Sequence, residues 1–97
     1  MRLAGRIAAA IEVLADMQAR HRPVAEALRD WGLSHRFAGA GDRAAIGNLV
    51  YDALRRRASI AWRMGGDTPW HLGIGAALFE WGIDPQELNA AFAEDRH

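Results

Sequence analysis

The sequence predicts an all-α domain, a small bundle of about five helices. Apolar residues recur at intervals of three and four along most of the chain, and no segment shows the strict alternation of a half-buried strand. Glycine and proline residues fall between these periodic segments, where they end one helix and begin the next. With 97 residues, the chain is long enough for one domain with one modest core.

The first helix is expected over residues 3–20. Its apolar residues follow the helical spacing: Ile7, Ile11, Val13, Leu14 and Met17. Pro23 suits the first turn of a second helix, because the N–H that proline lacks has no helical partner there. This helix is expected to end at Gly32, since glycine is common just beyond a helix C-terminus. Residues 33–41 are expected to form a loop.

A long third helix is expected from Asp42, a favoured N-cap residue, to about Met64, with residues 65–67 (Gly-Gly-Asp) ending it. At 100° per residue, one apolar stripe forms its core face: Ile46, Leu49, Val50, Ala53, Leu54, Ile60, Ala61 and Met64. Arg57 falls inside this stripe, so it must extend toward solvent, meet a buried acid or lie at a bend. Asp52 and Arg56 have the spacing of an intrahelical ion pair.

Thr68 and Pro69 are expected to begin a fourth helix that extends to residue 81 and is closed by Gly82. Residues 84–87 (Asp-Pro-Gln-Glu) form a variant of the capping box, which places Asp84 as the cap of a short fifth helix. The fourth helix contains a Gly-x-Gly sequence at Gly73 and Gly75. Because no strand precedes it, these glycines are expected to allow close helix–helix approach and not to bind a nucleotide.

The composition excludes several functional classes. The chain has no cysteine, which excludes disulfides, thiolate zinc sites and thiol nucleophiles and favours a cytoplasmic location. No apolar run approaches the roughly 20 residues that a membrane helix needs, so no membrane partner is expected. The four histidines show no paired metal-ligand spacing, and no nucleophile–base arrangement is evident. We therefore expect no catalytic residue, metal or cofactor within these residues.

All twelve basic residues are arginines, and they are unevenly distributed. Residues 1–65 contain eleven arginines and six acidic residues, whereas residues 66–97 contain one arginine and six acidic residues. Arginine's planar, five-donor guanidinium is well suited to phosphates and base edges. The distribution therefore indicates either a basic face for nucleic acid or attraction between the two parts of the chain through ion pairs.

The candidate RNA-binding residues are Arg36, Arg43, Tyr51, Arg55, Arg56 and Arg63. Tyr51 and Arg55 lie on the side of the third helix away from its core stripe, where they could stack on a base and bind a phosphate. The alternative is that Tyr51 packs partly exposed and Arg55 is a solvated charge. The four tryptophans are expected to be mostly core residues, with one or two at helix ends available for stacking on bases.

Three short matches carry a family resemblance: Asp42-Arg43, Leu49-Val50-Tyr51 and Leu54-Arg55. In this order they resemble the central helix of the N-terminal domain of the Sun/Fmu (RsmB-like) rRNA cytosine-C5 methyltransferases, a domain that is itself similar to the NusB antitermination factor. The expected order of helices agrees over nearly the whole chain. The family often has glycine at the position of Asp52, and its later helices are longer than those of this chain.

The resemblance implies that residues 1–97 form one NusB-like domain, the N-terminal module of a longer methyltransferase. The family's Asp-Arg pair falls on Asp42 and Arg43, and its helix arginine falls on Arg55. Such a module is non-catalytic and helps position ribosomal RNA for a catalytic domain in cis, which would hold the S-adenosylmethionine cofactor and the catalytic cysteines. The alternative is a protein-interaction module that docks a catalytic domain or a NusB-type antitermination partner through apolar helix faces and the acidic C-terminal third.

Overall fold

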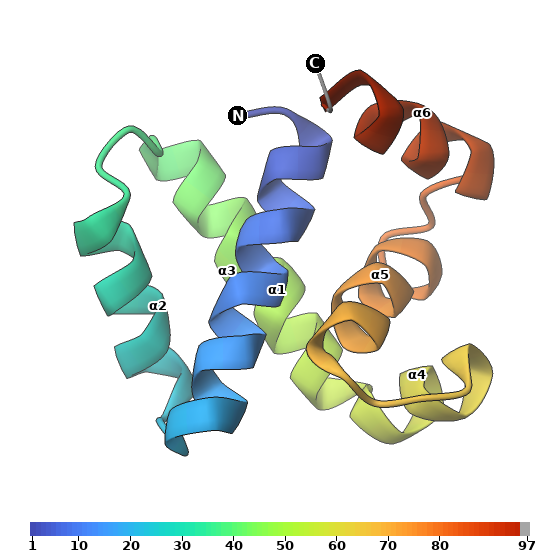
Figure 1. Ribbon diagram of the computed structural model, residues 1–97, viewed down its shortest axis with the longest axis horizontal. Coiled ribbons are helices and arrows are strands. Elements are labelled where there is room, and N and C mark those ends of the chain that lie inside the picture. Colours follow the sequence, from blue (N-terminus) through green and yellow to red (C-terminus); the bar gives the residue numbers. More distant parts are fainter. Residues whose placement is uncertain (96–97) are drawn as a thin grey trace.

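The computed structural model describes residues 1–95, and these residues form α-helices and no strands. The all-α prediction is confirmed, with six helices in place of the expected five because the expected third helix is two helices (Figure 1). They are α1 (Leu3–Arg20), α2 (Val24–Ser34), α3 (Ala40–Arg55), α4 (Arg57–Met64), α5 (Pro69–Phe79) and α6 (Pro85–Asp95). None of these helices has the length and apolar character needed to cross a membrane.

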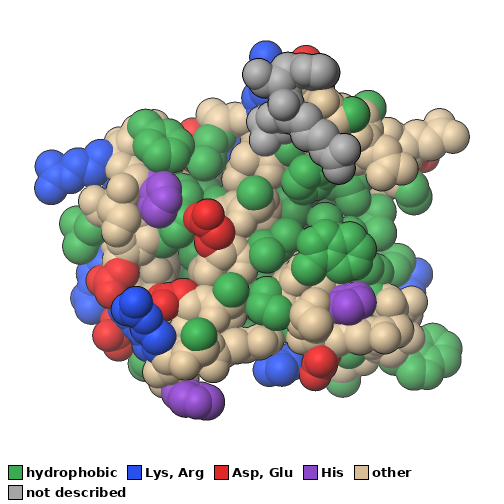
Figure 2. All heavy atoms as spheres, in the orientation of Figure 1, with side chains coloured by type: hydrophobic (Ala, Val, Ile, Leu, Met, Phe, Trp, Pro, Cys, Tyr) green, Lys and Arg blue, Asp and Glu red, His purple; other side chains and the backbone are tan. Residues whose placement is uncertain are grey.

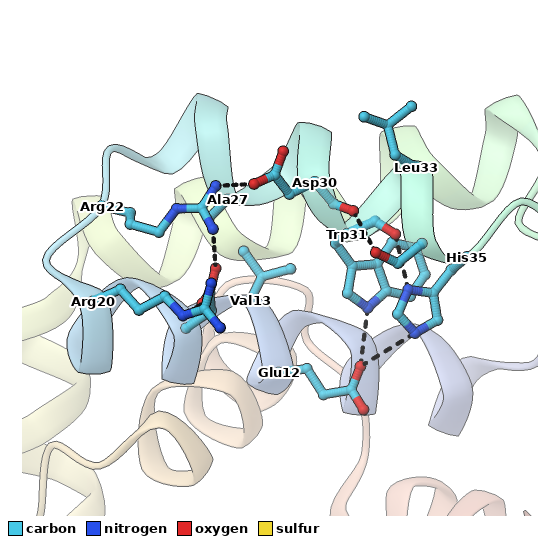
Figure 3. A pocket seen from close by; sticks show the side chains of 11 residues that line it. Glu12, Val13, Arg20, Arg22, Ala27, Asp30, Trp31, Leu33 and His35 are labelled. Atoms are coloured by element: carbon cyan, nitrogen blue, oxygen red, sulfur yellow. Dashed lines mark hydrogen bonds and ion pairs between the residues drawn. The ribbon is translucent and has the colours of Figure 1, made fainter.

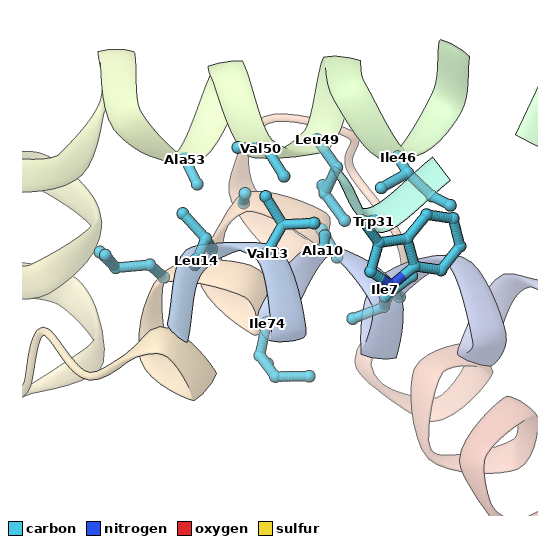
Figure 4. Packing of buried hydrophobic residues seen from close by; sticks show 14 of the residues in the cluster. Ile7, Ala10, Val13, Leu14, Trp31, Ile46, Leu49, Val50, Ala53 and Ile74 are labelled. Atoms are coloured by element: carbon cyan, nitrogen blue, oxygen red, sulfur yellow. The ribbon is translucent and has the colours of Figure 1, made fainter. Parts of the chain in front are cut away.

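The first helix, α1, is the centre of the fold, because it packs against α2, α3, α5 and α6. Figure 1 shows α1 and α3 crossing in the middle of the molecule, with α2 on one side and α4, α5 and α6 on the other. The core lies at this crossing, where Val13 and Leu14 of α1 face Leu49 and Val50 of α3 (Figure 4). All four side chains are almost completely buried.

The second helix continues two residues beyond the expected end at Gly32, so the prediction that Gly32 follows the helix was wrong. Gly32 is buried inside the helix and faces the guanidinium of Arg43, whose Nη2 donates a hydrogen bond to the Gly32 carbonyl at 3.1 Å. A Cβ at Gly32 would lie 3.5 Å from Nη1 of Arg43. The residue therefore gives space to a side chain from another helix, and the connection to α3 shortens to residues 35–39.

The N-cap of α3 is Gly39, and the prediction that Asp42 caps this helix was wrong. Asp42 lies in the first turn, and its carboxylate accepts hydrogen bonds from Nε of Arg6 at 2.9 Å and from the amino group of Met1 at 3.2 Å. A long-range charged pair thus takes the oxygen atoms that a cap would use for backbone N–H groups. Asp42 connects the start of α3 to the start of α1.

The connection between Asp42 and Arg6 predicts a specific acid dependence of stability. Its hydrogen bond with Arg6, followed by that with the Met1 amino group, lowers the pKa of Asp42 below its ordinary value. A carboxylate whose pKa is lower in the folded state stabilises the protein above its ordinary pKa of about 3.9, and this stabilisation is lost as the pH falls through the folded pKa. We therefore expect Asp42→Asn to be destabilised at neutral pH and to lose less further stability below about pH 4 than the wild type.

Urea unfolding at a series of pH values measures this effect. Arg6→Ala removes the same contact from its other partner, so it should flatten the acid dependence in the same direction. Parallel stability curves for the wild type and Asp42→Asn between neutral and acid pH would show that the Asp42–Arg6 pair does not contribute.

The expected third helix is interrupted at Arg56, whose backbone angles (φ −110°, ψ 21°) are not helical. No glycine or proline causes this break. The change of direction lets Ile60 of α4 pack against Gly75 of α5, where a Cβ on Gly75 would overlap the Ile60 side chain. A Cβ on Gly73 would likewise lie 2.5 Å from Cγ1 of Ile11. The prediction that these two glycines allow close helix–helix approach is confirmed.

The remaining helix ends depend on local chemistry that the sequence predicted. Thr68 is the N-cap of α5 and accepts the backbone N–H of His71 at 3.3 Å, with Pro69 in the first helical position. Asp84 accepts the backbone N–H of Gln86 at 2.8 Å at the start of α6. Both turn glycines have positive φ values, as residues that end helices often do: Gly65 (76°) and Gly82 (68°).

The fifth helix ends at Phe79, two residues earlier than expected. Trp81 turns out of the helical path, and its indole Nε1–H donates a hydrogen bond to Oδ2 of Asp52 on α3 at 3.0 Å. This bond ties the end of α5 to α3, next to the break at Arg56. It also places Asp52, which was expected to pair with Arg56, between Trp81 and Arg55.

Candidate nucleic-acid interface

The six candidate RNA-binding residues lie in two groups at opposite ends of α3 (Figure 1). Arg36 and Arg43 lie at the connection between α2 and α3. The other residues lie at the end of α3 and on α4: Tyr51, Arg55, Arg56 and Arg63. Residues 43 and 55 are twelve positions apart on one helix, which corresponds to about 18 Å. The two groups are therefore separate surfaces.

In the first group, Arg43 donates hydrogen bonds to backbone carbonyls, whereas Arg36 forms no such bond within residues 1–95. Nε of Arg43 donates to the Ala38 carbonyl at 3.0 Å, and Nη2 donates to the Gly32 carbonyl, so this side chain joins α2 to the start of α3. Arg36 is exposed and forms no ion pair with the described residues. Next to it, Phe37 is also exposed. Arg43 keeps its charge, but two of its five N–H donors are used to join α2 to α3, so this group has fewer donors left for a phosphate than two free arginines would have.

The second group, which we call the α4 corner, consists of Tyr51, Trp62 and four arginines: Arg55, Arg56, Arg57 and Arg63. The break at Arg56 turns α4 away from the line of α3 (Figure 1). All six of these residues are exposed. The charged residues of α4 are all arginines. On α4, Arg63 follows Trp62 directly in the sequence, whereas Arg57 lies five residues earlier and about 140° around the helix from Trp62.

Trp62 is the most exposed large hydrophobic residue of the described chain, with 85% of its surface accessible. Tyr51 is 46% exposed. The expectation that the tryptophans are mostly core residues was wrong for Trp62 and for Trp70, which is 54% exposed. A signal for Trp62 was present in the sequence, because on a helix of 100° per residue it lies about 160° from Ile46.

Three of the four arginines form ion pairs with carboxylates, and these pairs orient them. Arg55 pairs with Asp52 one turn earlier, Arg56 Nε lies 3.4 Å from Glu80, and Arg57 Nη2 lies 3.9 Å from Asp67. The guanidinium carbon of Arg63 lies 3.7 Å above the centre of the Phe79 ring. The three paired arginine side chains remain half-exposed or more.

The three ion pairs of the α4 corner differ in exposure. Arg57 and Asp67 are both exposed, and an exposed ion pair contributes about 0–1 kcal/mol, so a phosphate can replace this carboxylate with a charge-assisted hydrogen bond. The carboxylates that pair with Arg55 and Arg56 are only 19% and 23% exposed, but both arginine side chains are more than half-exposed and have further N–H donors. The α4 corner therefore carries oriented guanidinium groups and an exposed indole, groups that can bind phosphates and stack on a base.

A second concave site, between α1 and α2, is lined by charged side chains that are paired with one another (Figure 3). It has a volume of about 400 Å³. Arg22 pairs with Asp30 and, at 3.3 Å, with Asp16, while Trp31 donates its indole N–H to Glu12 at 2.9 Å. The hydrogen bond with Asp30 raises the pKa of Arg22, and the same bond lowers the pKa of Asp30. These charges hold α1 and α2 together.

The described residues also provide no metal centre, since no three potential ligands of the types His, Cys, Asp and Glu converge in residues 1–95. Comparison of the chain with protein families, curated proteins and solved structures finds no match.

Proposed function

We propose that this domain is a non-catalytic module that binds single-stranded RNA through the α4 corner. The observation that carries the proposal is Trp62, an almost fully exposed indole on a helix whose charged residues are all arginines. Proteins that bind single strands combine aromatic side chains, on which bases stack, with basic groups along the backbone. Here Trp62 and Tyr51 supply the aromatic surfaces, and the four arginines of the α4 corner supply the phosphate contacts.

The biological role that we propose is to help position ribosomal RNA for an S-adenosylmethionine-dependent cytosine-C5 methyltransferase domain in cis. This part of the proposal is supported by the resemblance of the Asp42-Arg43, Leu49-Val50-Tyr51 and Leu54-Arg55 matches to the N-terminal domain of that family. In this role the present chain holds the RNA, and both the cofactor and the reaction belong to the other domain.

Trp62→Ala tests the proposal directly. Stacking contributes about 1–3 kcal/mol per base, so we expect this variant to bind a labelled single-stranded ribosomal RNA fragment about 5- to 150-fold more weakly. Fluorescence anisotropy at two salt concentrations measures the affinity and its salt dependence, which should have a slope near −0.7 for each phosphate contacted. Binding to inorganic polyphosphate, which has no bases, should be unchanged in the variant.

The matched control is Trp70→Ala, which removes the second exposed indole from α5, outside the α4 corner. It should bind the RNA like the wild type. The proposal is wrong if the wild-type domain does not bind the RNA at low salt, or if the two tryptophan variants lose affinity equally.

A further inference from the structure

An apolar groove lies between α5 and α6, away from the polar site between α1 and α2. Its volume is about 390 Å³. It is lined mainly by Met64 of α4, Trp70, Ile74 and Leu78 of α5, and Leu88 and Phe92 of α6. In Figure 2, hydrophobic side chains gather in the region between α6 and α5. The groove is open to solvent on one side, because Trp70 is half-exposed.

The groove is open because α6 does not cover α5. The contacts of α6 are mainly with α1, whereas α5 packs against α1, α3 and α4. Yet α5 contains no Asp, Glu, Lys or Arg in its eleven residues, and a helix that is apolar on all sides is normally covered on all sides. Three neighbours cover most of α5, and the groove is the part of its apolar surface that remains.

Two carboxylates lie next to the lining of this groove at the start of α6. Asp84 immediately precedes Pro85, which also lines the groove, and Glu87 immediately precedes Leu88. Neither forms an ion pair within the described residues 1–95, whereas three other acids of this part of the chain are paired: Glu80 with Arg56, Asp67 with Arg57 and Glu94 with Arg2. An occupant of this groove therefore meets an apolar floor with negative charge beside its α6 edge.

We infer that this groove docks an amphipathic helix of a partner protein, one with an apolar stripe flanked by lysine or arginine. The apolar lining selects a helix with anchors at positions i, i+3 or i+4, and i+7, the usual pattern of helix-in-groove recognition. The acidic surroundings select basic flanks over acidic ones. The proposal is independent of RNA binding, because none of the residues that line the groove belongs to the α4 corner.

A pair of synthetic peptides tests the inference with the intact domain. One labelled helical peptide carries leucines at i, i+4 and i+7 with lysine flanks, and the other has glutamate in place of each lysine. We expect the basic peptide to bind and the acidic peptide to bind at least tenfold more weakly in fluorescence anisotropy. The double variant Asp84→Asn/Glu87→Gln should reduce this preference and its salt dependence, and the asparagine side chain retains an oxygen that can cap α6.

Two further variants locate the binding site. Trp70→Ala should weaken the basic peptide about tenfold or more, because tryptophan anchors dominate such interfaces, while Trp62→Ala should leave peptide binding unchanged. Asn89→Arg places a cation at an exposed position of the groove lining, where it should block a basic helix without removing a core contact. Circular dichroism and thermal unfolding verify that each variant remains folded.

Three results would overturn the inference. The first is that the basic peptide does not bind, and the second is equal binding of the basic and acidic peptides. The third is concentration-dependent self-association of the domain that is lost in Trp70→Ala, which would show that the groove holds a second copy of this chain. Since RNA binding is measured separately and depends on Trp62, failure of this proposal leaves the RNA-binding proposal unaffected.

Discussion

Replacing Gly75 with alanine is expected to leave the protein about 1–3 kcal/mol less stable than replacing Gly47 with alanine. A Cβ on Gly75 would overlap the side chain of Ile60 and lie 3.0 Å from Cγ of Met64. Ile60 is buried and branched at Cβ, so its side chain cannot turn aside without moving α4. The new methyl group therefore separates α4 from α5 or strains both helices.

Gly47→Ala is the matched control because Gly47 also lies inside a helix, where alanine is favoured over glycine by about 1 kcal/mol. A Cβ there would make only an ordinary contact, 3.8 Å from Leu28 Cδ1, so this variant should be more stable than the wild type. The difference between the two variants isolates the steric effect. Urea unfolding measures it, and in a domain of this size each kcal/mol changes the Tm by about 4–8 °C. Equal stability of the two variants would show that α4 and α5 do not pack at this distance.

Replacing Arg55 and Arg56 together with alanine is expected to lower the affinity for single-stranded RNA by at least about tenfold, with the fold retained. Hydrogen bonds to charged groups contribute about 1.5–3 kcal/mol each, and the fold should be retained because the two arginine side chains are 63% and 61% exposed and their truncation removes no core contact. If each arginine contacts one phosphate, the salt slope should decrease in magnitude by about 1.4. The affinity is measured by anisotropy at a series of salt concentrations.

The matched control, Arg2→Ala/Arg20→Ala, removes the same charge from two exposed ion-paired arginines at the ends of α1. Its RNA affinity should change much less if the α4 corner is the site. Asp52→Asn should change the RNA affinity in the opposite direction. The substitution removes the carboxylate that pairs with Arg55, and the asparagine side-chain oxygen can still accept the Trp81 indole N–H. This variant should bind RNA more tightly than the wild type. Equal losses in the two double-arginine variants would mean that only the overall charge matters.

The sequence predicted those helix ends that depend on neighbouring residues. Thr68 and Asp84 act as caps, and Gly65 ends α4 with a positive φ, because each of these features needs only the few residues beside it; α5, in contrast, ends at Phe79, before the expected stop at Gly82. The errors came from long-range contacts. Arg6 binds Asp42 from 36 positions away, and Arg43 reaches back to the carbonyl of Gly32. Local helix propensity is a weak signal that such contacts override.

The candidate site was predicted in part, and its missing elements come from other helices. The run of arginines at residues 55–57 is evident in the sequence, but the acids that orient Arg56 and Arg57, Glu80 and Asp67, are distant in the chain. These two pairs, together with Arg2–Glu94, also confirm that the basic and acidic parts of the chain are joined by ion pairs. The exposure of Trp62 agrees with its position on the helix, about 160° from Ile46, whereas the apolar spacing of residues 46–64 did not predict the break at Arg56.

The central position of α1 determines when the protein can fold during its synthesis. This helix is made before the others, yet it packs against α5 and α6, which are separated from it by most of the chain. On the ribosome, α2 and α3 are available early to pack against the apolar face of α1. The rest of that face stays uncovered until the last third of the chain, which contains α5 and α6, has been synthesised. The core is thus completed late and through contacts of large sequence separation, which slows folding relative to a bundle whose helices pack only on their neighbours in sequence.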